Sequence, residues 1–460
     1  MTHSLRHRRR AVALTTICLL LMPMAGCSDL LEATDPDLIN PVDVESPEGA
    51  AALRIGALER FRDMTGGNES TWLFGGLLAD EWSTSSTFVQ NDETDQRLIQ
   101  LNNGSITGMY RDINRVRTAA NQAIRGLRTY LPTRTTDIAE MYFARGFAEM
   151  QLAQDFCNGI PLSDGSGEVP VFGVPLTVAE VFQHAITSYD SALALADTFA
   201  VSAKIRQSAR VGKARALVGL GQYAAAAALV SVAEVPTSFA YNHTFAITSG
   251  DNTIWGQPAS SRRYTVGDSL EGNGRNLLVL NAIPFFSAQD PRLPVTYTIG
   301  SKGDTLKSQD GSTFSRTTGL YGRLTPLPVV NGIDARLIEA EAALAAGDTT
   351  GMFAILDALR ANPPRLGEVQ PAAMAALTDP GTTPARVNLL FREKAFWTFS
   401  RGQRLGDLRR LIRQYGRTPD TTFPVGTHYK GGDYGPDVNL PVPQQEQNNP
   451  NFTGCLDRNA

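Results

Sequence analysis

Apolar residues recur every three or four positions over long stretches of the chain, which is the period of an amphipathic helix. The first such stretch, 46–64, opens with Ser-Pro-Glu, a typical helix start with a capping serine and proline at the first helical position. A second long stretch covers about 109–130, and another, 386–414, lies near the C-terminus. The pattern predicts a mainly α-helical protein.

Helical stretches also come in pairs, within about 109–236 and 331–364. We expect 136–156 to pack against 177–199, and 208–236 and 335–364 each to form two helices. Small residues recur where antiparallel helices would approach closely, as in tetratricopeptide repeats. The alternative is that alanine-rich helices simply pack together, but the repeated order of small and large residues favours repeat pairs. The positions in 208–236 that fit the repeat are Gly212, Ala216, Leu217, Leu220, Gly221, Tyr223 and Ala226.

Two segments, 65–108 and 237–330, differ from the paired helices. Both interleave small polar residues and glycine with scattered aromatic residues. The second segment cannot be one long helix, so we expect loops, short strands and short helices that lie on the helical scaffold. The last residues, 415–460, are irregular and rich in proline.

The N-terminus resembles a bacterial lipoprotein signal. Four arginines and no acid precede an apolar run of about a dozen residues, too short to span a membrane. The run ends in Met-Ala-Gly before Cys27, an order similar to the lipobox, in which the cysteine is acylated and becomes the first mature residue. We therefore expect a signal peptide at 1–26, lipid attachment at Cys27 and a tether at 27–45. The alternative is an ordinary secreted protein cut nearby.

Without residues 1–26, the chain keeps 38 of its 42 basic residues and all 46 acids, a net charge of −8. This balance argues against nucleic acid as a partner, because phosphate binding needs a basic face. Two cysteines then remain besides Cys27, namely Cys157 and Cys455. An exported chain meets an oxidising compartment, so a disulfide between them is one hypothesis and two separate thiols are the other.

The sequence offers little for catalysis. His184, His243 and His428 stand apart, and the chain has no HExxH, G-x-S-x-G, Walker A or GxGxxG motif. The acids of 91–95 lack the spacing of a calcium loop, and we expect a solvated loop there. The sequence therefore predicts no catalytic residue, no metal site and no cofactor.

Two stretches near the C-terminus, LLFREKAFWTFSRGQRLGDLRRL at 389–411 and the proline-containing tail, resemble the C-terminal signature of the SusD/RagB family of outer-membrane nutrient-binding lipoproteins. The departures are Arg401, where the family commonly has glutamate, and Leu405-Gly406 in place of an aromatic pair. From the residues alone we expect Asp407 to pair with Arg404 and Arg410. The matching positions are Glu393, Gly402, Arg404, Asp407, Leu408, Arg409, Arg410, Pro441, Pro443, Glu446, Asn449, Pro450 and Asn451.

The resemblance implies a single SusD-like domain at 46–460, with tetratricopeptide-like helix pairs as a scaffold and the signature at 386–460. It implies a lipoprotein of the outer membrane that faces outward. There it would capture a glycan or other oligomer for a SusC-like TonB-dependent transporter. The alternatives are a helical-repeat scaffold that binds a protein partner, and a carbohydrate-active enzyme.

Exposed aromatic rings are the features that would bind a sugar, since sugar rings present apolar C–H faces. In the resembled family the ligand lies in loops outside the repeats, which corresponds to 65–108 and 237–330 here. For any one aromatic residue, burial in the core is the competing interpretation. The candidates on these loops are Trp72, Trp82, Phe88, Trp255 and Tyr264.

Overall fold

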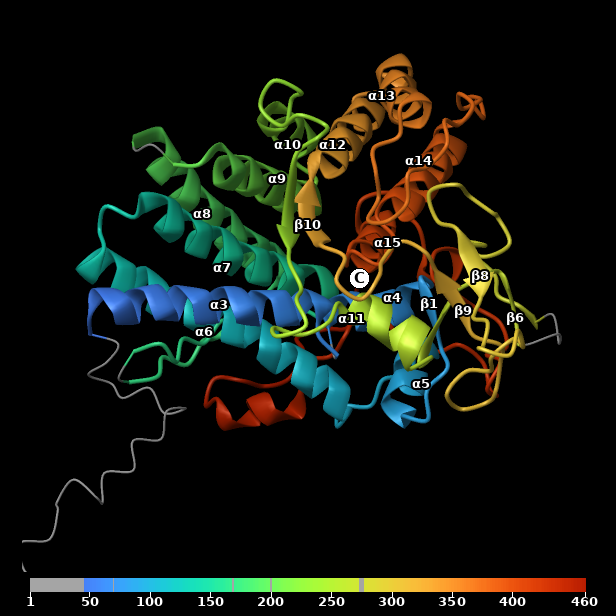
Figure 1. Cartoon of the computed structure of the whole chain (residues 1–460), viewed down its shortest axis with the longest axis horizontal. Helices are drawn as coiled ribbons and strands as arrows, with labels where there is room; N and C mark the ends of the chain where they lie inside the picture. The colour runs from blue at the N-terminus through green and yellow to red at the C-terminus, as the bar shows by residue number, and fades with distance from the viewer. Residues whose placement is uncertain (1–44, 69, 168, 199–200, 273–276) are drawn as a thin grey trace, which may run out of the picture.

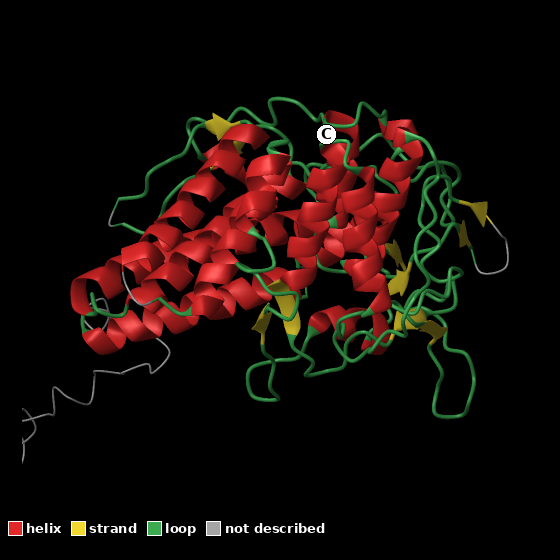
Figure 2. Ribbon diagram, turned by 90° about the horizontal axis from the view of Figure 1, so that it is seen from above, coloured by secondary structure: helices red, strands yellow, loops and turns green. Residues whose placement is uncertain are grey.

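The computed structural model describes residues 45–68, 70–167, 169–198, 201–272 and 277–460. Long helices lie side by side at one end of the molecule, while loops and short strands gather at the other (Figures 1 and 2). Residues 1–44, which include Cys27 and most of the expected tether, lie outside the described residues. Among the described residues, no helix has the length and apolar character needed to cross a membrane.

The helices bear out a mainly α architecture. As predicted, α7 packs against α8, α9 against α10, and α12 against α13, while α3 lies along α6. The helices are α3 (Pro47–Gly66), α4 (Thr71–Ala79), α5 (Val89–Asp95), α6 (Gly104–Tyr130), α7 (Thr135–Asp155), α8 (Val178–Thr198), α9 (Ala203–Gly219), α10 (Tyr223–Leu229), α11 (Thr253–Trp255), α12 (Gly332–Ala345), α13 (Thr349–Ala361), α14 (Thr383–Trp397) and α15 (Arg404–Arg413).

Small residues let these helices approach closely. The ring of Tyr189 on α8 packs so closely that a Cβ would lie 3.0 Å from it at Gly146 of α7 and only 2.4 Å from it at Gly212 of α9. Tyr189 is fully buried, so its ring fills the space between three helices. The small residues seen in the sequence thus serve one shared contact.

The strands are short and pair two by two. β1 (Trp82–Thr84) pairs antiparallel with β5 (Tyr264–Val266), and β4 (Ala240–His243) with β10 (Leu327–Asn331). The first pair ties 237–330 to the segment after α4, while the second joins the two ends of 237–330 to each other. The other pairs are β2 (Ile160–Pro161) with β3 (Pro175–Leu176), β6 (Leu270–Glu271) with β7 (Leu277–Leu278), and β8 (Val295–Tyr297) with β9 (Arg316–Thr318).

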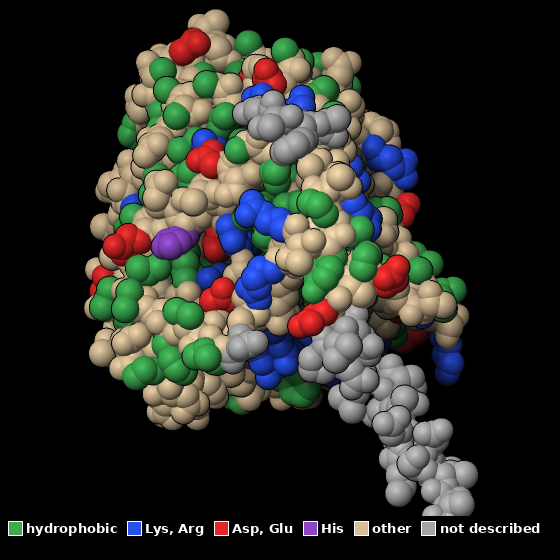
Figure 3. All heavy atoms as spheres, turned by 90° about the vertical axis from the view of Figure 1, so that its left-hand side faces the viewer, with side chains coloured by type: hydrophobic (Ala, Val, Ile, Leu, Met, Phe, Trp, Pro, Cys, Tyr) green, Lys and Arg blue, Asp and Glu red, His purple; other side chains and the backbone are tan. Residues whose placement is uncertain are grey.

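The surface of the helical end mixes charges of both signs. On the face in Figure 3, Lys and Arg side chains are interspersed with Asp and Glu and with apolar side chains. This mixture gives that face no extended field of one sign.

The structure corrects the predicted elements in two segments. Segment 65–108 is not mainly loop, because α4 and α5 lie within it; all nine residues of α4 are buried, so its sequence shows no polar face. The stretch 386–414 is two helices rather than one, divided by a turn in which Ser400 and Gly402 have φ of 56° and 62°. The indole of Trp72 lies where a Cβ at position 402 would be, so the turn requires glycine there.

The signature residues serve the structure. Asp407 pairs with Arg410 as expected, and also with Lys394 at 2.9 Å. The expected pair with Arg404 is wrong, because Arg404 reaches away from its own helix to Asp80, 2.9 Å from its Nε. All these side chains are buried, so the signature joins α14 and α15 to the end of α4.

Cys157 and Cys455 form a disulfide, with Cα atoms 5.9 Å apart. Gly159 has a positive φ of 107°, and the tail passes so close that a Cβ would lie 2.8 Å from the backbone nitrogen of Leu456. The tail covers this turn after α7, and Cys157 is buried. The disulfide is therefore part of a packed contact between the tail and the end of α7.

Glu81 supports the turn after α14 from within the core. Its Oε1 accepts a hydrogen bond from the backbone N–H of Ser400 at 2.9 Å, and Trp82 Nε1–H donates to Ser400 Oγ at 3.3 Å. Burial raises the pKa of Glu81 to about 8, the Ser400 N–H lowers it in part, and nearby Asp80 raises it further. The folded protein thus holds a protonated carboxyl at neutral pH.

We expect Glu81→Gln to stabilise the protein at pH 7 by up to about 3 kcal/mol. The folded-state pKa of Glu81 lies above its ordinary value of 4.5. The contribution of this carboxyl to stability is therefore fully present below pH 4.5 and is lost as pH rises to about 8. Glutamine keeps the shape and never ionises, so its advantage should vanish near pH 4. Urea unfolding at both pH values measures this, with the exposed Glu48→Gln as control. An equal effect at both pH values would contradict the prediction.

Candidate functional site

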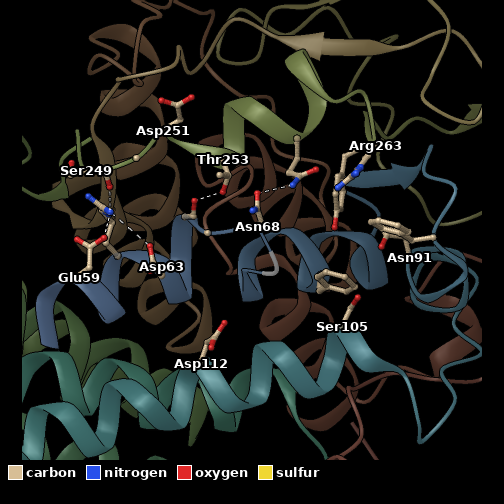
Figure 4. Close-up of a pocket in the computed structure, with 18 residues that line it drawn as sticks. Glu59, Asp63, Asn68, Asn91, Ser105, Asp112, Ser249, Asp251, Thr253 and Arg263 are labelled. Atoms are coloured by element: carbon tan, nitrogen blue, oxygen red, sulfur yellow. Dashed lines mark hydrogen bonds and ion pairs between the residues drawn. The ribbon is translucent and has the colours of Figure 1, made fainter. Parts of the chain in front are cut away.

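A cavity of about 770 Å³ lies where the end of α3, the start of α4, helices α5 and α6, and segment 249–264 meet (Figure 4). Asn252 positions the last of these segments, because its side chain caps α11 and donates to the carbonyl oxygen of Thr325 at 3.0 Å. Thr253 then donates from its hydroxyl to the carbonyl oxygen of Gly66 at the end of α3. The cavity is therefore closed on one side by segments about 190 positions apart.

Aromatic rings form part of the cavity wall. Phe88 is 46% exposed, and the Arg263 guanidinium lies over its ring, 4.6 Å from the centroid. Phe74 and Tyr264 also line the cavity but are almost fully buried, with ring centroids 6.4 Å apart in an edge-to-face arrangement. Phe88 is thus the wall residue that offers a large apolar face to solvent.

Polar side chains stand close to these rings. Gln257 Nε2–H donates to Asn68 Oδ1 at 2.9 Å, and Figure 4 draws this bond as a dashed line at Asn68. Gln257 Oε1 and Arg263 Nε are buried and have no hydrogen-bond partner in the described part of the chain. Asn91 and Ser105 complete this part of the wall. The arrangement combines an apolar ring face with donors and acceptors, which is how concave ligand sites fix an orientation.

The charged lining is acidic in excess. Four acids and two arginines line the cavity, and Arg62 is already paired with Glu59 and with the carbonyl oxygen of Ser249. Burial raises the pKa of Asp63, Arg62 opposes this, and Asp112 raises it further. In Figure 4 Asp112 rises from α6 toward the cavity, opposite the end of α3. The site therefore favours uncharged ligands over anionic ones.

The structure separates the five aromatic candidates. Phe88 and Tyr264 line the cavity, although Tyr264 is only 2% exposed. The prediction that Trp72 and Trp82 bind a ligand is wrong, because both side chains are 0% exposed. They lie in α4 and β1 under the turn after α14, so neither presents a ring to a ligand. Trp255 is half-buried against the core and does not line this cavity.

Several lining residues left no signal in the sequence. Asn68, Asp112, Gln257 and Arg263 belong to no motif and are brought together only by the packing of distant segments. Phe88 did leave a signal, because it is an aromatic residue in a stretch of small polar residues.

The expected solvated loop at 91–95 is instead helix α5, and its acids are engaged. Asp95 accepts a hydrogen bond from the backbone N–H of Thr84 at 2.8 Å and lies 3.2 Å from His428 Nε2. Asp92 pairs with Lys430 at 2.6 Å. Within the described ranges, no group of three or more His, Cys, Asp or Glu side chains is arranged to hold a metal ion.

The fold is similar to that of solved SusD-like proteins. A SusD superfamily protein from Bacteroides vulgatus aligns with a TM-score of 0.59 and 15% identity, over 89% of this chain and 99% of that one. Surface glycan-binding protein A from Bacteroides uniformis gives 0.59 and 13%, over 89% and 99%. A laminarin-binding SusD-like protein gives 0.56 and 16%, over 89% and 99%. No protein-family model and no curated protein matches the sequence. The chain therefore has the SusD-like fold.

Proposed function

We propose that the protein is a surface-exposed lipoprotein that binds an oligosaccharide in the cavity beside Phe88 and passes it to a SusC-like TonB-dependent transporter. The observation that carries this proposal is the exposed ring of Phe88 next to the amide groups of Asn68, Asn91 and Gln257. Sugar C–H faces stack on such rings, and hydroxyl groups pair with amides. Two proteins of similar fold are named for glycan or laminarin binding, which supports the same ligand class.

The proposed activity is binding without turnover. The acids that line the cavity are engaged in ion pairs, such as Glu59 with Arg62 and Asp251 with Arg323 at 2.8 Å. Glycoside hydrolysis needs two carboxyl groups placed on opposite sides of a bond, one of them protonated to act as an acid. The lining offers hydrogen bonds and a stacking face instead.

A glycan panel that contains neutral oligosaccharides and their uronic-acid counterparts tests the ligand class. We expect neutral oligosaccharides to bind and the anionic ones to bind at least about tenfold more weakly, because four acids line the cavity. Product analysis of the same mixtures should show no cleavage. Preferred binding of anionic glycans, or binding of none, would contradict the proposal.

Phe88→Ala is expected to weaken binding of the best neutral oligosaccharide about tenfold, since stacking on one ring contributes about 0.5–1.5 kcal/mol beyond the area buried. Isothermal titration calorimetry measures the change. The matched control is Phe172→Ala, because Phe172 is similarly exposed, at 49%, and does not line the cavity. Equal affinities for the Phe88 variant and the parent protein would place the ligand elsewhere.

The membrane anchor is tested separately. Cys27→Ser should yield a soluble, non-acylated product, because the acyl chains that hold the protein on the bilayer attach to that cysteine. Metabolic labelling with a fatty acid measures acylation, and unchanged labelling would refute the anchor. Proteolysis of intact cells should release the anchored protein if it faces outward, while full protection would favour a periplasmic scaffold.

A further inference from the structure

An apolar surface loop lies between β2 and β3, at residues 169–174. Its sequence, VPVFGV, holds no charged side chain and none that can form a hydrogen bond. Single apolar side chains are normal on a protein surface, but several neighbouring ones mark a place of contact with another body. The side chains of this apolar loop that are between 49% and 78% exposed are Val169, Val171, Phe172 and Val174.

The backbone is hydrogen-bonded within the protein at two positions of the apolar loop. Val171 N–H donates to the carbonyl oxygen of Asp164 at 2.8 Å, and the Val171 carbonyl oxygen accepts from Asp164 N–H at 2.9 Å. Gly173 N–H donates to Ser163 Oγ at 3.0 Å, and its carbonyl oxygen accepts from Asn449 Nδ2–H at 2.8 Å. These backbone groups keep their hydrogen bonds when water leaves, which a contact with lipid requires.

The apolar loop lies at the end of the molecule where α3 begins, drawn in green beneath the left-hand part of α3 in Figure 1. The turn that leads into it is held on α6, because Arg125 Nη1–H donates to Ser166 Oγ at 2.6 Å. The next residue of α6, Gly126, packs on α3, where a Cβ at this position would lie 3.4 Å from the Cβ of Ala50. Ala50 is in the first turn of α3, directly after the expected tether at 27–45. The same turn of α6 therefore contacts both the start of α3 and the base of the apolar loop.

The expected tether brings the apolar loop near the bilayer without fixing its orientation. From Cys27 to Glu45 a fully extended chain spans at most about 60 Å. Because the anchor makes any further contact with the same bilayer intramolecular, a weak contact is enough to select one orientation. A protein interface carries about one hydrogen bond per 100–200 Å², and the side chains of the apolar loop can form none. Lipid needs apolar surface alone, so it is the occupant that this loop fits.

We propose that the apolar loop enters the lipid surface of the membrane in which Cys27 anchors the protein, and so fixes how the molecule stands on that membrane. The proposal rests on the lipid anchor of the proposed function. Apolar side chains of this kind settle about 5–10 Å into the boundary between headgroups and acyl chains. The cavity beside Phe88 stays free, because Ser105, which also lines it, lies about 30 Å from Arg125 along α6.

The test uses the mature chain with its disulfide intact, coupled through the Cys27 thiol to a maleimide lipid in vesicles of phosphatidylethanolamine and phosphatidylglycerol. The coupling replaces natural acylation, so a failure of the anchor in cells and a failure of the loop are separate results. Phe172→Trp places a fluorescent probe on the apolar loop, and brominated acyl chains quench a tryptophan that touches them. We expect these chains to quench most of the fluorescence that the new tryptophan adds. The parent protein, with its own four tryptophans, gives the background.

Phe88→Trp is the matched control for the probe, because Phe88 is similarly exposed and lies by the other end of α6; its tryptophan should stay unquenched. Added to Phe172→Trp, Val169→Asp should abolish the quenching, because a carboxylate does not enter the apolar part of the bilayer. Ile247→Asp should leave the quenching unchanged. Ile247 is as exposed as Val169, but it lies near Ser249, which accepts a hydrogen bond from Arg62 at the other end of α3.

Thermal unfolding checks that each variant folds. The proposal is overturned if the probe at 172 is quenched no more than the parent protein, or if the probe at 88 is quenched equally. It is also overturned if the quenching survives Val169→Asp. If no quenching occurs and Val169→Asp instead separates the protein from its transporter in detergent extracts, the apolar loop is a protein interface and the proposal is wrong.

Discussion

Replacement of Glu341 by alanine is expected to lower the free energy of unfolding by about 3–5 kcal/mol. Glu341 on α12 is fully buried and accepts hydrogen bonds from three side chains. Arg410 binds both its oxygens, Lys394 Nζ lies 2.8 Å away, and the Tyr415 hydroxyl donates at 2.9 Å. Alanine would leave the two cations partly unpaired in the core, which costs more than the pair itself contributes.

The same cluster makes the free energy of unfolding depend on pH. Burial alone would raise the pKa of Glu341, but Arg410 and Lys394 outweigh it and lower the pKa to about 2. A folded-state pKa below the ordinary value of 4.5 stabilises the folded state above about pH 4.5. This contribution is lost as pH falls toward 2. The parent protein should therefore lose stability between these pH values, and the Glu341→Ala variant should lose less.

Guanidinium or urea titrations at pH 7 and pH 3 measure both effects. The control is Glu234→Ala, because Glu234 also pairs with an arginine, Arg210 at 2.9 Å, but is exposed. An exposed pair contributes about 1 kcal/mol or less, so this variant should unfold almost as the parent does. Equal losses of unfolding free energy for the two variants would contradict the prediction, because burial of the Glu341 cluster would then add nothing to stability.

The helix pairs could be predicted from the sequence because small residues such as Gly212 recur where helices pack closely. The sequence did not show that one ring, that of Tyr189 on α8, packs against both Gly146 of α7 and Gly212 of α9. Helix α4 was missed for the opposite reason: all its residues are buried, so no polar face marks it as a helix. Periodicity therefore predicts helices at the edge of a core better than helices inside it.

The candidate site was predictable only in part, because burial of an aromatic side chain depends on segments far away in the chain. Trp82 and Phe88 lie six positions apart, yet the turn after α14 covers the first, while the second stays exposed. The polar part of the cavity wall also depends on distant segments, since Asn68 and Gln257 form a hydrogen bond although they are 189 positions apart in the chain. The sequence singled out Phe88 and Tyr264 among the side chains that line the cavity, but not the polar side chains around them.

The disulfide between Cys157 and Cys455 should give the largest single effect. It closes a loop with a sequence separation of 298, which in the chain-entropy model stabilises the folded state by about 5 kcal/mol. Its surroundings are already ordered: Cys157 N–H donates to the carbonyl oxygen of Leu440 at 2.9 Å, and Asn158 Nδ2–H donates to the Asp457 carboxylate at 3.0 Å. The bridge therefore acts mainly by restricting the unfolded chain.

Reduction is expected to lower the free energy of unfolding by about 5 kcal/mol while leaving the helical content of the folded protein unchanged. Urea titrations followed by circular dichroism, with and without reductant, measure this. The double variant Cys157→Ala/Cys455→Ala serves as the control, because reductant should not change its unfolding.

Thiol counting with a maleimide provides the independent check. In the unfolded, unreduced mature protein no thiol should react, and after reduction two should react, because the Cys27 sulfur is expected to carry lipid. Two reactive thiols before reduction would disprove the disulfide in solution. In that case the contacts of Asn158 with the tail would have to hold the C-terminus against α7 alone, and reductant would leave the unfolding of the parent protein unchanged.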